Sequence, residues 1–114
     1  MSSAALFGLL WDALVDLLGT AAAAMILRRA ARRAAKGDSD LAGLAFVREN
    51  LEYRYTLPPS WSDSSGEADR ALRGLVAELL PLLVELTGPV VVSRIAQIPE
   101  LEMRGIIPRA EEPP

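Results

Sequence analysis

Residues 3–37 form the longest uninterrupted stretch of the chain, and they constrain its fold more than any other part. The stretch contains no proline and is rich in alanine and leucine, which both favour helices. Ser2 or Ser3 suits the N-cap, and Gly37 stands where a glycine commonly ends a helix. We therefore predict one long helix over residues 3–37, about 45–50 Å in length. Such a helix would be longer than a compact domain of 114 residues is wide.

The predicted N-terminal helix is apolar on nearly every side. Between Leu6 and Leu27 its only charged residues are Asp12 and Asp16, which lie one turn apart and share a face. A helix of this kind is buried in a core, an oligomer or a membrane. Because a short chain has few other elements to cover it, we predict that it packs against a second chain. The predicted interface combines apolar residues of this helix with later aromatic residues: Leu10, Trp11, Leu14, Leu17, Leu18, Tyr53, Tyr55 and Trp61.

A membrane location is the first alternative. Residues 4–27 are long enough to span a bilayer, and basic residues follow them, as the positive-inside rule requires. Asp12 and Asp16 count against insertion, since each carboxylate costs about 2.5–3.5 kcal/mol near the membrane centre. We therefore expect a cytoplasmic protein, with attachment to the membrane surface as the alternative.

Residues 28–36 contain five basic residues and no acidic residue. Such a cluster can bind the phosphate groups of nucleic acid or of anionic lipid. Nucleic acid is not the favoured partner, because the net charge is −3 and no aromatic residue interleaves with the cluster. The alternative is an exposed helix end that pairs with the acidic second half of this chain or of another copy. The candidate anion-binding residues are Arg28, Arg29, Arg32 and Arg33.

The chain has neither cysteine nor histidine, which excludes several chemistries. Disulfides, thiol nucleophiles, zinc sites built on these residues and triads with a histidine base are all ruled out. Asp12 and Asp16 could together hold a proton or a cation, but an exposed helix edge is the simpler interpretation. With Tyr53 and Tyr55 they form the most polar group available to a small-molecule ligand. We predict a protein without enzymatic activity, cofactor or metal.

Further helices are predicted after residue 40, from the spacing of the apolar residues. They lie at residues 41–51, 67–87 and 90–98, with one more turn over residues 99–105. Pro81 lies inside the second of them and should kink it or end its first half. Gly88 followed by Pro89 is the typical sequence where one helix stops and the next starts.

One segment, at residues 53–57, is predicted to be extended. Its apolar and polar residues alternate, and tyrosine and threonine favour strands. It serves either as a linker or as a strand that pairs with the same strand of another copy. In the loop that follows, we expect Trp61 to be tucked onto the helices, and an exposed anchor for a partner is the alternative.

These observations predict a single all-α, mainly helical domain over residues 1–105, with about four helices and an oligomeric state. An acidic, proline-rich tail is expected over residues 106–114. The excess of arginine over lysine, with much alanine, glycine and leucine, suggests a GC-rich bacterial genome. The predicted function is that of a non-catalytic interaction protein, which self-associates or is a small structural or regulatory subunit of a larger bacterial assembly. The alternatives are membrane attachment through residues 4–27 and binding of phosphate-rich ligands through residues 28–36.

Overall fold

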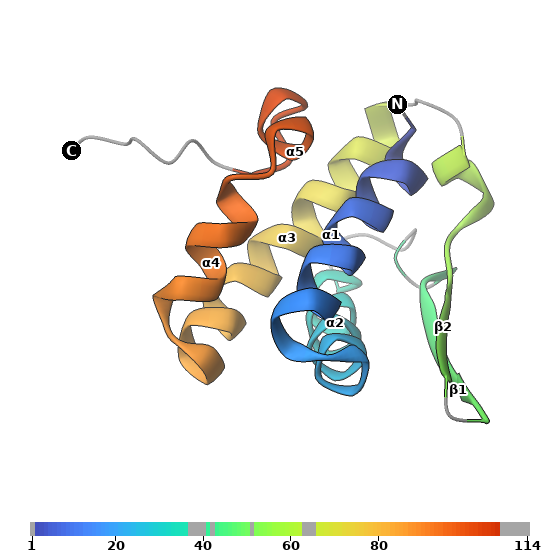
Figure 1. Cartoon of the computed structure of the whole chain (residues 1–114). Helices are drawn as coiled ribbons and strands as arrows, with labels where there is room; N and C mark the ends of the chain where they lie inside the picture. Colours follow the sequence, from blue (N-terminus) through green and yellow to red (C-terminus); the bar gives the residue numbers. More distant parts are fainter. Residues whose placement is uncertain (1, 37–40, 42, 51, 63–65, 108–114) are drawn as a thin grey trace.

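The computed structural model describes residues 2–36, 41, 43–50, 52–62 and 66–107, and it shows a mainly helical protein with one small sheet. Figure 1 shows the arrangement of the elements along the chain. In order, the described elements are α1 (Ser3–Leu18), α2 (Thr20–Ala34), β1 (Ala45–Glu49), β2 (Glu52–Thr56), the 3-10 helix η2 (Pro59–Ser62), α3 (Gly66–Thr87), α4 (Pro89–Ala96) and α5 (Pro99–Met103).

The prediction of one long N-terminal helix is wrong, because the chain turns sharply at Gly19. This residue has φ 88° and ψ 163°, a conformation that residues with a side chain rarely adopt. Its N–H donates to the carbonyl of Val15 at 2.8 Å, and its own carbonyl accepts from the N–H of Ala23 at 3.1 Å. Gly19 therefore ends α1 and starts α2. The two helices fold back on each other, and the Cα radius of gyration is 13.3 Å, as expected for a compact domain.

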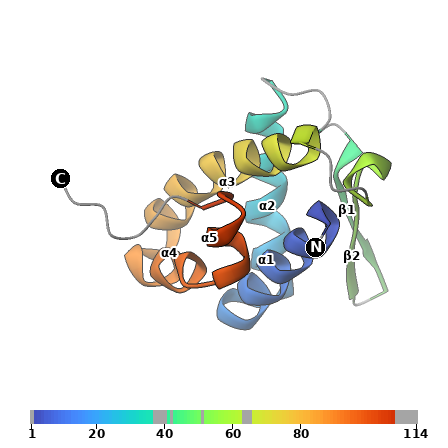
Figure 2. The same cartoon turned by 90° about the horizontal axis from the view of Figure 1, so that it is seen from above.

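Helix α3 packs against α1, α2 and α4 in the centre of the core. Leu6, Leu10 and Leu14 follow one face of α1 at helical spacing, and all three are fully buried. Leu75 and Leu79 of α3 are fully buried as well. Figures 1 and 2 show α4 and α5 on one side of this helical core and the two strands on the opposite side. The apolar face of α1 is thus covered by its own chain.

The boundary between α3 and α4 lies where it was predicted. Gly88 has φ 85°, which favours glycine, and Pro89 is the first residue of α4. Helix α3 continues through Pro81 to Thr87, so this proline does not end the helix. The prediction of a short helix at residues 90–98 and of a further turn after it is confirmed by α4 and α5.

Two residues that were assigned to the C-terminal tail belong to the packed domain. Ile106 and Ile107 are each only 3% exposed. Gly105 has φ 72°, and the N–H of Ile106 donates to the carbonyl of Leu101 at 2.9 Å, which directs the chain back onto the core. The packed domain therefore extends at least to residue 107, beyond the predicted limit of 105. Residues 108–114 of the predicted tail lie outside the described residues.

Strands β1 and β2 form an antiparallel hairpin, which corrects two predictions. Residues 45–49 are a strand and not part of a helix over residues 41–51. The extended segment is a strand that pairs with β1 of its own chain and not a linker. Its pairing with the same strand of a second chain stays a prediction. Asn50, in the connection, has φ 61°, a left-handed conformation that asparagine tolerates better than most residues.

Aromatic side chains attach the hairpin to α1. The ring of Tyr55 lies 4.8 Å from that of Phe7 and 5.3 Å from that of Trp11, measured between centroids. Phe46 of β1 stacks on Trp11 at 6.0 Å. Trp61 of η2 is fully buried beside Phe7, so the prediction that it is tucked onto the helices is confirmed. A lone hairpin is marginally stable in water, so this packing is what keeps β1 and β2 in place.

The apolar stretch at residues 4–27 is divided between α1 and α2 by the turn at Gly19. Within the described part of the chain, no helix combines the length and the apolar character that crossing a bilayer requires.

Candidate interaction surface

Four arginines of α2, namely Arg28, Arg29, Arg32 and Arg33, are exposed to solvent. We refer to them as the α2 arginines. They occupy the C-terminal half of the helix, where cations complement the helix dipole. Among the described residues, the ion pairs join other side chains, and none includes an α2 arginine. Pairing with the acidic second half of the same chain, the expected alternative, is therefore not seen in the described part of the structure.

Arg28 differs from the other three because the chain holds its side chain in place. Its Nη2 atom donates a hydrogen bond to the backbone carbonyl of Phe46 at 2.9 Å, which joins α2 to β1. A guanidinium has five N–H groups in a planar fork. Arg28 thus keeps donors for a further acceptor while its position is already restricted.

Two open hollows flank Arg28 along the outer side of α2, and we call the pair the α2 groove. The N-terminal hollow has a volume of about 370 Å³ and is lined by Ala21, Ala22, Ala24, Met25, Arg28 and Tyr53. The C-terminal hollow has a volume of about 330 Å³. Its walls are Arg28, Ala31, Arg32 and Ala35 on α2, and Leu41, Leu44 and Phe46 opposite them. Arg28 lines both hollows, so the two meet at this side chain.

The described lining of the α2 groove is mostly apolar, with a few polar groups. Small or apolar side chains form most of both hollows, and the polar groups are Arg28, Arg32 and Tyr53. Among the described residues, no carboxylate lines either hollow. Across the described residues, no group of three or more acidic side chains is arranged to hold a metal ion. The groove can accept apolar side chains next to an anionic group.

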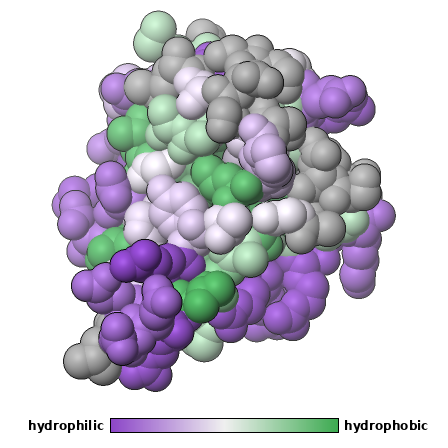
Figure 3. Space-filling model, turned by 90° about the vertical axis from the view of Figure 1, so that its right-hand side faces the viewer, coloured by the Kyte–Doolittle hydropathy of each residue, from purple (hydrophilic) through white to green (hydrophobic). Residues whose placement is uncertain are grey.

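Figure 3 views the molecule from the hairpin side. Hydrophobic side chains appear there as separate small areas between hydrophilic ones. Val47 is 51% exposed on the outer face of the hairpin, where Arg54 is its strand partner. This face therefore offers separate apolar contacts and no broad apolar sheet.

A third groove lies between α3 and the chain after α5. It has a volume of about 490 Å³, and its lining includes Val76, Leu80, Pro81 and Ile106. Arg73 is the charged residue among the described residues of the lining. As far as its lining is described, this groove is apolar like the α2 groove but has no cluster of cations.

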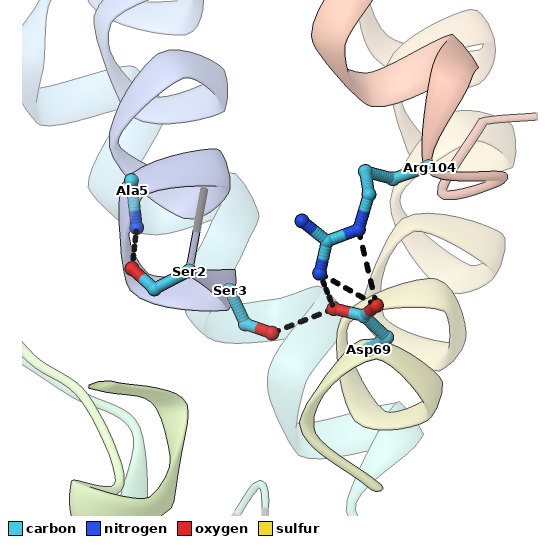
Figure 4. A network of polar contacts seen from close by, with 5 residues as sticks. All are labelled: Ser2, Ser3, Ala5, Asp69 and Arg104. Atoms are coloured by element: carbon cyan, nitrogen blue, oxygen red, sulfur yellow. Dashed lines mark hydrogen bonds and ion pairs between the residues drawn. The ribbon is translucent and has the colours of Figure 1, made fainter. Parts of the chain in front are cut away.

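A polar network joins the starts of α1 and α3 to the end of α5, as Figure 4 shows. The hydroxyl of Ser3 donates to Oδ1 of Asp69 at 2.7 Å, and Nη2 of Arg104 contacts Oδ2 of Asp69 at 2.8 Å. Burial raises the pKa of the Asp69 carboxyl. The Ser3 hydroxyl, the Arg104 guanidinium and the charge of Arg73 outweigh that effect and hold the pKa below its ordinary value. Because Ser3 is fully buried, the network holds three elements together and offers no open site.

The carboxylate pair of α1 shows no special arrangement. Asp12 and Asp16 are both exposed, in agreement with the simpler interpretation as a helix edge. Burial raises the pKa of the Tyr55 phenol, and the charge of Asp12 raises it further. Tyr55 therefore stays neutral at physiological pH and acts as a packing residue against α1.

The predicted interface residues lie in three environments: fully buried, half-buried and exposed. Leu10, Leu14 and Trp61 are fully buried by their own chain, and Leu17 is 37% exposed. The others are half-buried: Trp11, Leu18, Tyr53 and Tyr55. Once the chain turns at Gly19, α3 and the hairpin cover the face of α1 that was expected to meet a partner. A charge at Leu14 would unfold the protein whether or not it associates, so that substitution cannot test association.

Sequence reasoning missed a second exposed surface, which we call the α3–α4 corner. It consists of the last turn of α3 and the first turn of α4, on either side of Gly88. Val84 is 48% exposed, Leu86 54% and Val90 67%, and Glu85 is exposed between the first two. Gly88 and Pro89 reveal the turn itself, but no sequence pattern shows which apolar residues around it stay uncovered.

Comparisons of the chain with protein-family models, with curated proteins and with solved structures found no match. The arrangement of the α2 groove and the α3–α4 corner is therefore the basis for a functional proposal.

Proposed function

We propose that the protein is a non-catalytic helical interaction protein that associates with protein chains, copies of itself first, through the α2 groove. The observation that carries this proposal is the group of exposed α2 arginines, unpaired among the described residues, beside two apolar hollows. A role as a small structural or regulatory subunit of a larger assembly would use the same surface.

The spacing of the α2 arginines supports a role in binding. Arg28 and Arg32 lie four residues apart, as do Arg29 and Arg33, so each pair shares a helix face. Like charges at this spacing destabilise a helix by about 0.2–0.5 kcal/mol per pair. Carboxylates of a partner would remove this repulsion and form charge-assisted hydrogen bonds. The arrangement thus costs the isolated chain stability and strengthens binding to an acidic surface.

Light scattering behind a sizing column tests the proposal. We expect the mass to rise above the 12.3 kDa of one chain as concentration increases, and to fall again at high salt. Arg28→Gln/Arg32→Gln should shift this rise to higher concentration. Arg70→Gln is the control, because Arg70 is an exposed arginine on α3 that lines neither hollow. A mass of one chain at every concentration, at low salt, would refute self-association.

The α2 arginines favour a second candidate function, the binding of phosphate-rich ligands. Four exposed cations on two helical turns could contact neighbouring phosphates. A long polyanion is disfavoured because the net charge of the chain is −3. Fluorescence anisotropy with a labelled single-stranded oligonucleotide at low salt tests this candidate. Binding that is lost when the α2 arginines become glutamine would support it, and no binding would exclude it.

A further inference from the structure

We propose that the α3–α4 corner of one copy docks into the α2 groove of a second copy, an inference that rests on the proposed function and names the surface that fills the groove. Both surfaces combine apolar groups with charged side chains, and the charges have opposite signs. In the groove, Arg28 stands between two apolar hollows. In the corner, Glu85 is exposed and is adjacent in sequence to the exposed Val84 and Leu86.

The apolar side chains of the corner are its first contribution. The described residues include seven exposed large hydrophobic side chains, and three of them (Val84, Leu86 and Val90) lie at this corner. Three consecutive residues, 84–86, are exposed although they point to different sides of α3. The last turn of α3 therefore presents a broad exposed side, next to the buried Leu82 and Leu83, to a second chain. Met25, 65% exposed in the N-terminal hollow, offers a flexible apolar surface to receive it.

The charges decide the orientation of the contact. An arginine and a carboxylate form paired, charge-assisted hydrogen bonds that also fix direction. Arg28 is held towards the groove by the carbonyl of Phe46, and Arg32 lies one turn further along the same side. Glu85 would meet these two guanidinium groups when its apolar neighbours enter the hollows. The rest of the chain is acidic, because the net charge of the whole chain is −3 even with the α2 arginines included, and this adds long-range attraction towards the basic face of α2.

The positions of the two surfaces determine the type of assembly. The groove lies where α2 meets the hairpin, and the corner lies on the opposite side, at α4, as Figures 1 and 2 show. A chain therefore cannot fill its own groove with its own corner. Contacts between different surfaces of successive copies produce rings or open chains. We expect assemblies of three or more chains at high concentration.

A charge exchange between two variants tests the proposal. Arg32→Glu places a carboxylate in the groove, and Glu85→Arg places a cation on the corner. Each variant alone should associate at least about tenfold more weakly than the wild type, because Arg32→Glu places a carboxylate opposite Glu85 and Glu85→Arg places a cation opposite Arg28 and Arg32. An equimolar mixture should regain assembly, since the new carboxylate of one variant then meets the new cation of the other, and the unchanged groove meets the unchanged Glu85. The double variant in one chain should assemble for the same reason.

Controls separate this effect from unfolding. Both substituted residues are exposed, so circular dichroism should match the wild type. Glu100→Arg, at an exposed glutamate of α5, changes the net charge as Glu85→Arg does and should leave assembly intact. Ala21→Trp should fill the N-terminal hollow and weaken assembly, whereas Ala77→Trp, in the groove beside α5, should not.

The outcomes show whether the inference fails alone or together with the proposed function. If Glu85→Arg assembles like the wild type while Arg32→Glu does not, another surface fills the groove, and only the inference fails. A mass that stops at two chains, or a mixture that fails to recover, also overturns the inference. If the wild type stays monomeric at every concentration, self-association fails and the inference fails with it.

Discussion

Two charged regions of this small protein use their arginines in opposite ways. Arg104 lies in the polar network, where it donates to both carboxylate oxygens of Asp69, and Asp69 also accepts from the buried Ser3 hydroxyl. Arg32 lies on α2, where no acidic partner is found among the described residues. The network of Arg104 joins three helices, whereas the charge of Arg32 faces the solvent. The paired charges join elements of the fold, and we propose that the charges without an ion-pair partner serve recognition.

The comparison also concerns burial. The side chains of Arg104 and Asp69 are 28% and 16% exposed, so their ion pair is partly shielded from water. Shielding strengthens the attraction, and it makes the loss of either partner costly. The α2 arginines are exposed, so salt screens them and their removal should cost the fold little. The following predictions test this difference, from the largest expected effect to the smallest.

Removing the carboxylate of the network should have the largest effect. Asp69→Ala leaves the hydroxyl of Ser3 and the guanidinium of Arg104 without that acceptor, and we expect a loss of about 2–3 kcal/mol in the free energy of unfolding. Urea unfolding followed by circular dichroism measures it. Ser3→Ala is the milder comparison and should lose about 1 kcal/mol. If Asp69→Ala is as stable as the wild type, the network does not hold the three helices together.

Acid should weaken the same network. The folded-state pKa of Asp69 lies below its ordinary value of 3.8, so the unfolded chain binds this proton more readily than the folded chain. The stabilisation is therefore complete above the unfolded pKa, about 3.9, and is lost as pH falls through the lower folded pKa. Unfolding free energies at neutral and acidic pH should differ more for the wild type than for Asp69→Asn. Equal differences in the two proteins would contradict the lowered pKa.

The exposed ion pair of the hairpin should matter much less than the network. Arg54 and Glu49 lie 3.5 Å apart, but their side chains are 70% and 62% exposed. Glu49→Gln should change the free energy of unfolding by no more than about 0.5 kcal/mol, because water screens the pair. It also removes the repulsion from Glu52, its direct partner across the strands. If Glu49→Gln lowers the free energy of unfolding as much as Asp69→Ala does, solvent exposure does not explain the difference between the two ion pairs.

The smallest effect on stability is expected at the α2 arginines. Arg32→Gln should leave the free energy of unfolding within about 0.5 kcal/mol of the wild type, because Arg32 is exposed and its charge repels that of Arg28. Thermal unfolding at low protein concentration checks this without interference from association. A clear loss of stability would give Arg32 a structural role and remove the contrast with Arg104.

Local signals in the sequence predicted part of this fold correctly. Gly88 and Pro89 mark a helix boundary through their own backbone preferences, which act whatever surrounds them. The long apolar face of α3 predicted a helix over nearly the observed range. The α2 arginines were predicted as candidate binding residues from their clustering alone. The absence of cysteine and histidine excluded whole classes of chemistry without any structure.

Other features depended on contacts that the sequence does not show. Gly19 is compatible both with a continuous helix and with a turn. The turn is found in a structure in which Leu6, Leu10 and Leu14 are packed in the core. Residues 45–49 have helical spacing in part, but β2 and the ring of Trp11 stabilise them as a strand. Because Leu10 and Leu14 are buried by their own chain, the candidate contact surface lies on α2 and not on α1.

The sequence by itself determined a mainly helical chain, the break at Gly88, the basic end of α2 and the absence of thiol and imidazole chemistry. These properties follow from single residues and their nearest neighbours. Only the tertiary structure decided that Gly19 turns the chain, that Phe46 holds Arg28 beside two hollows, and that the α3–α4 corner stays uncovered. Each of these depends on residues distant in sequence, and their contacts decide between local conformations that differ by about 1 kcal/mol.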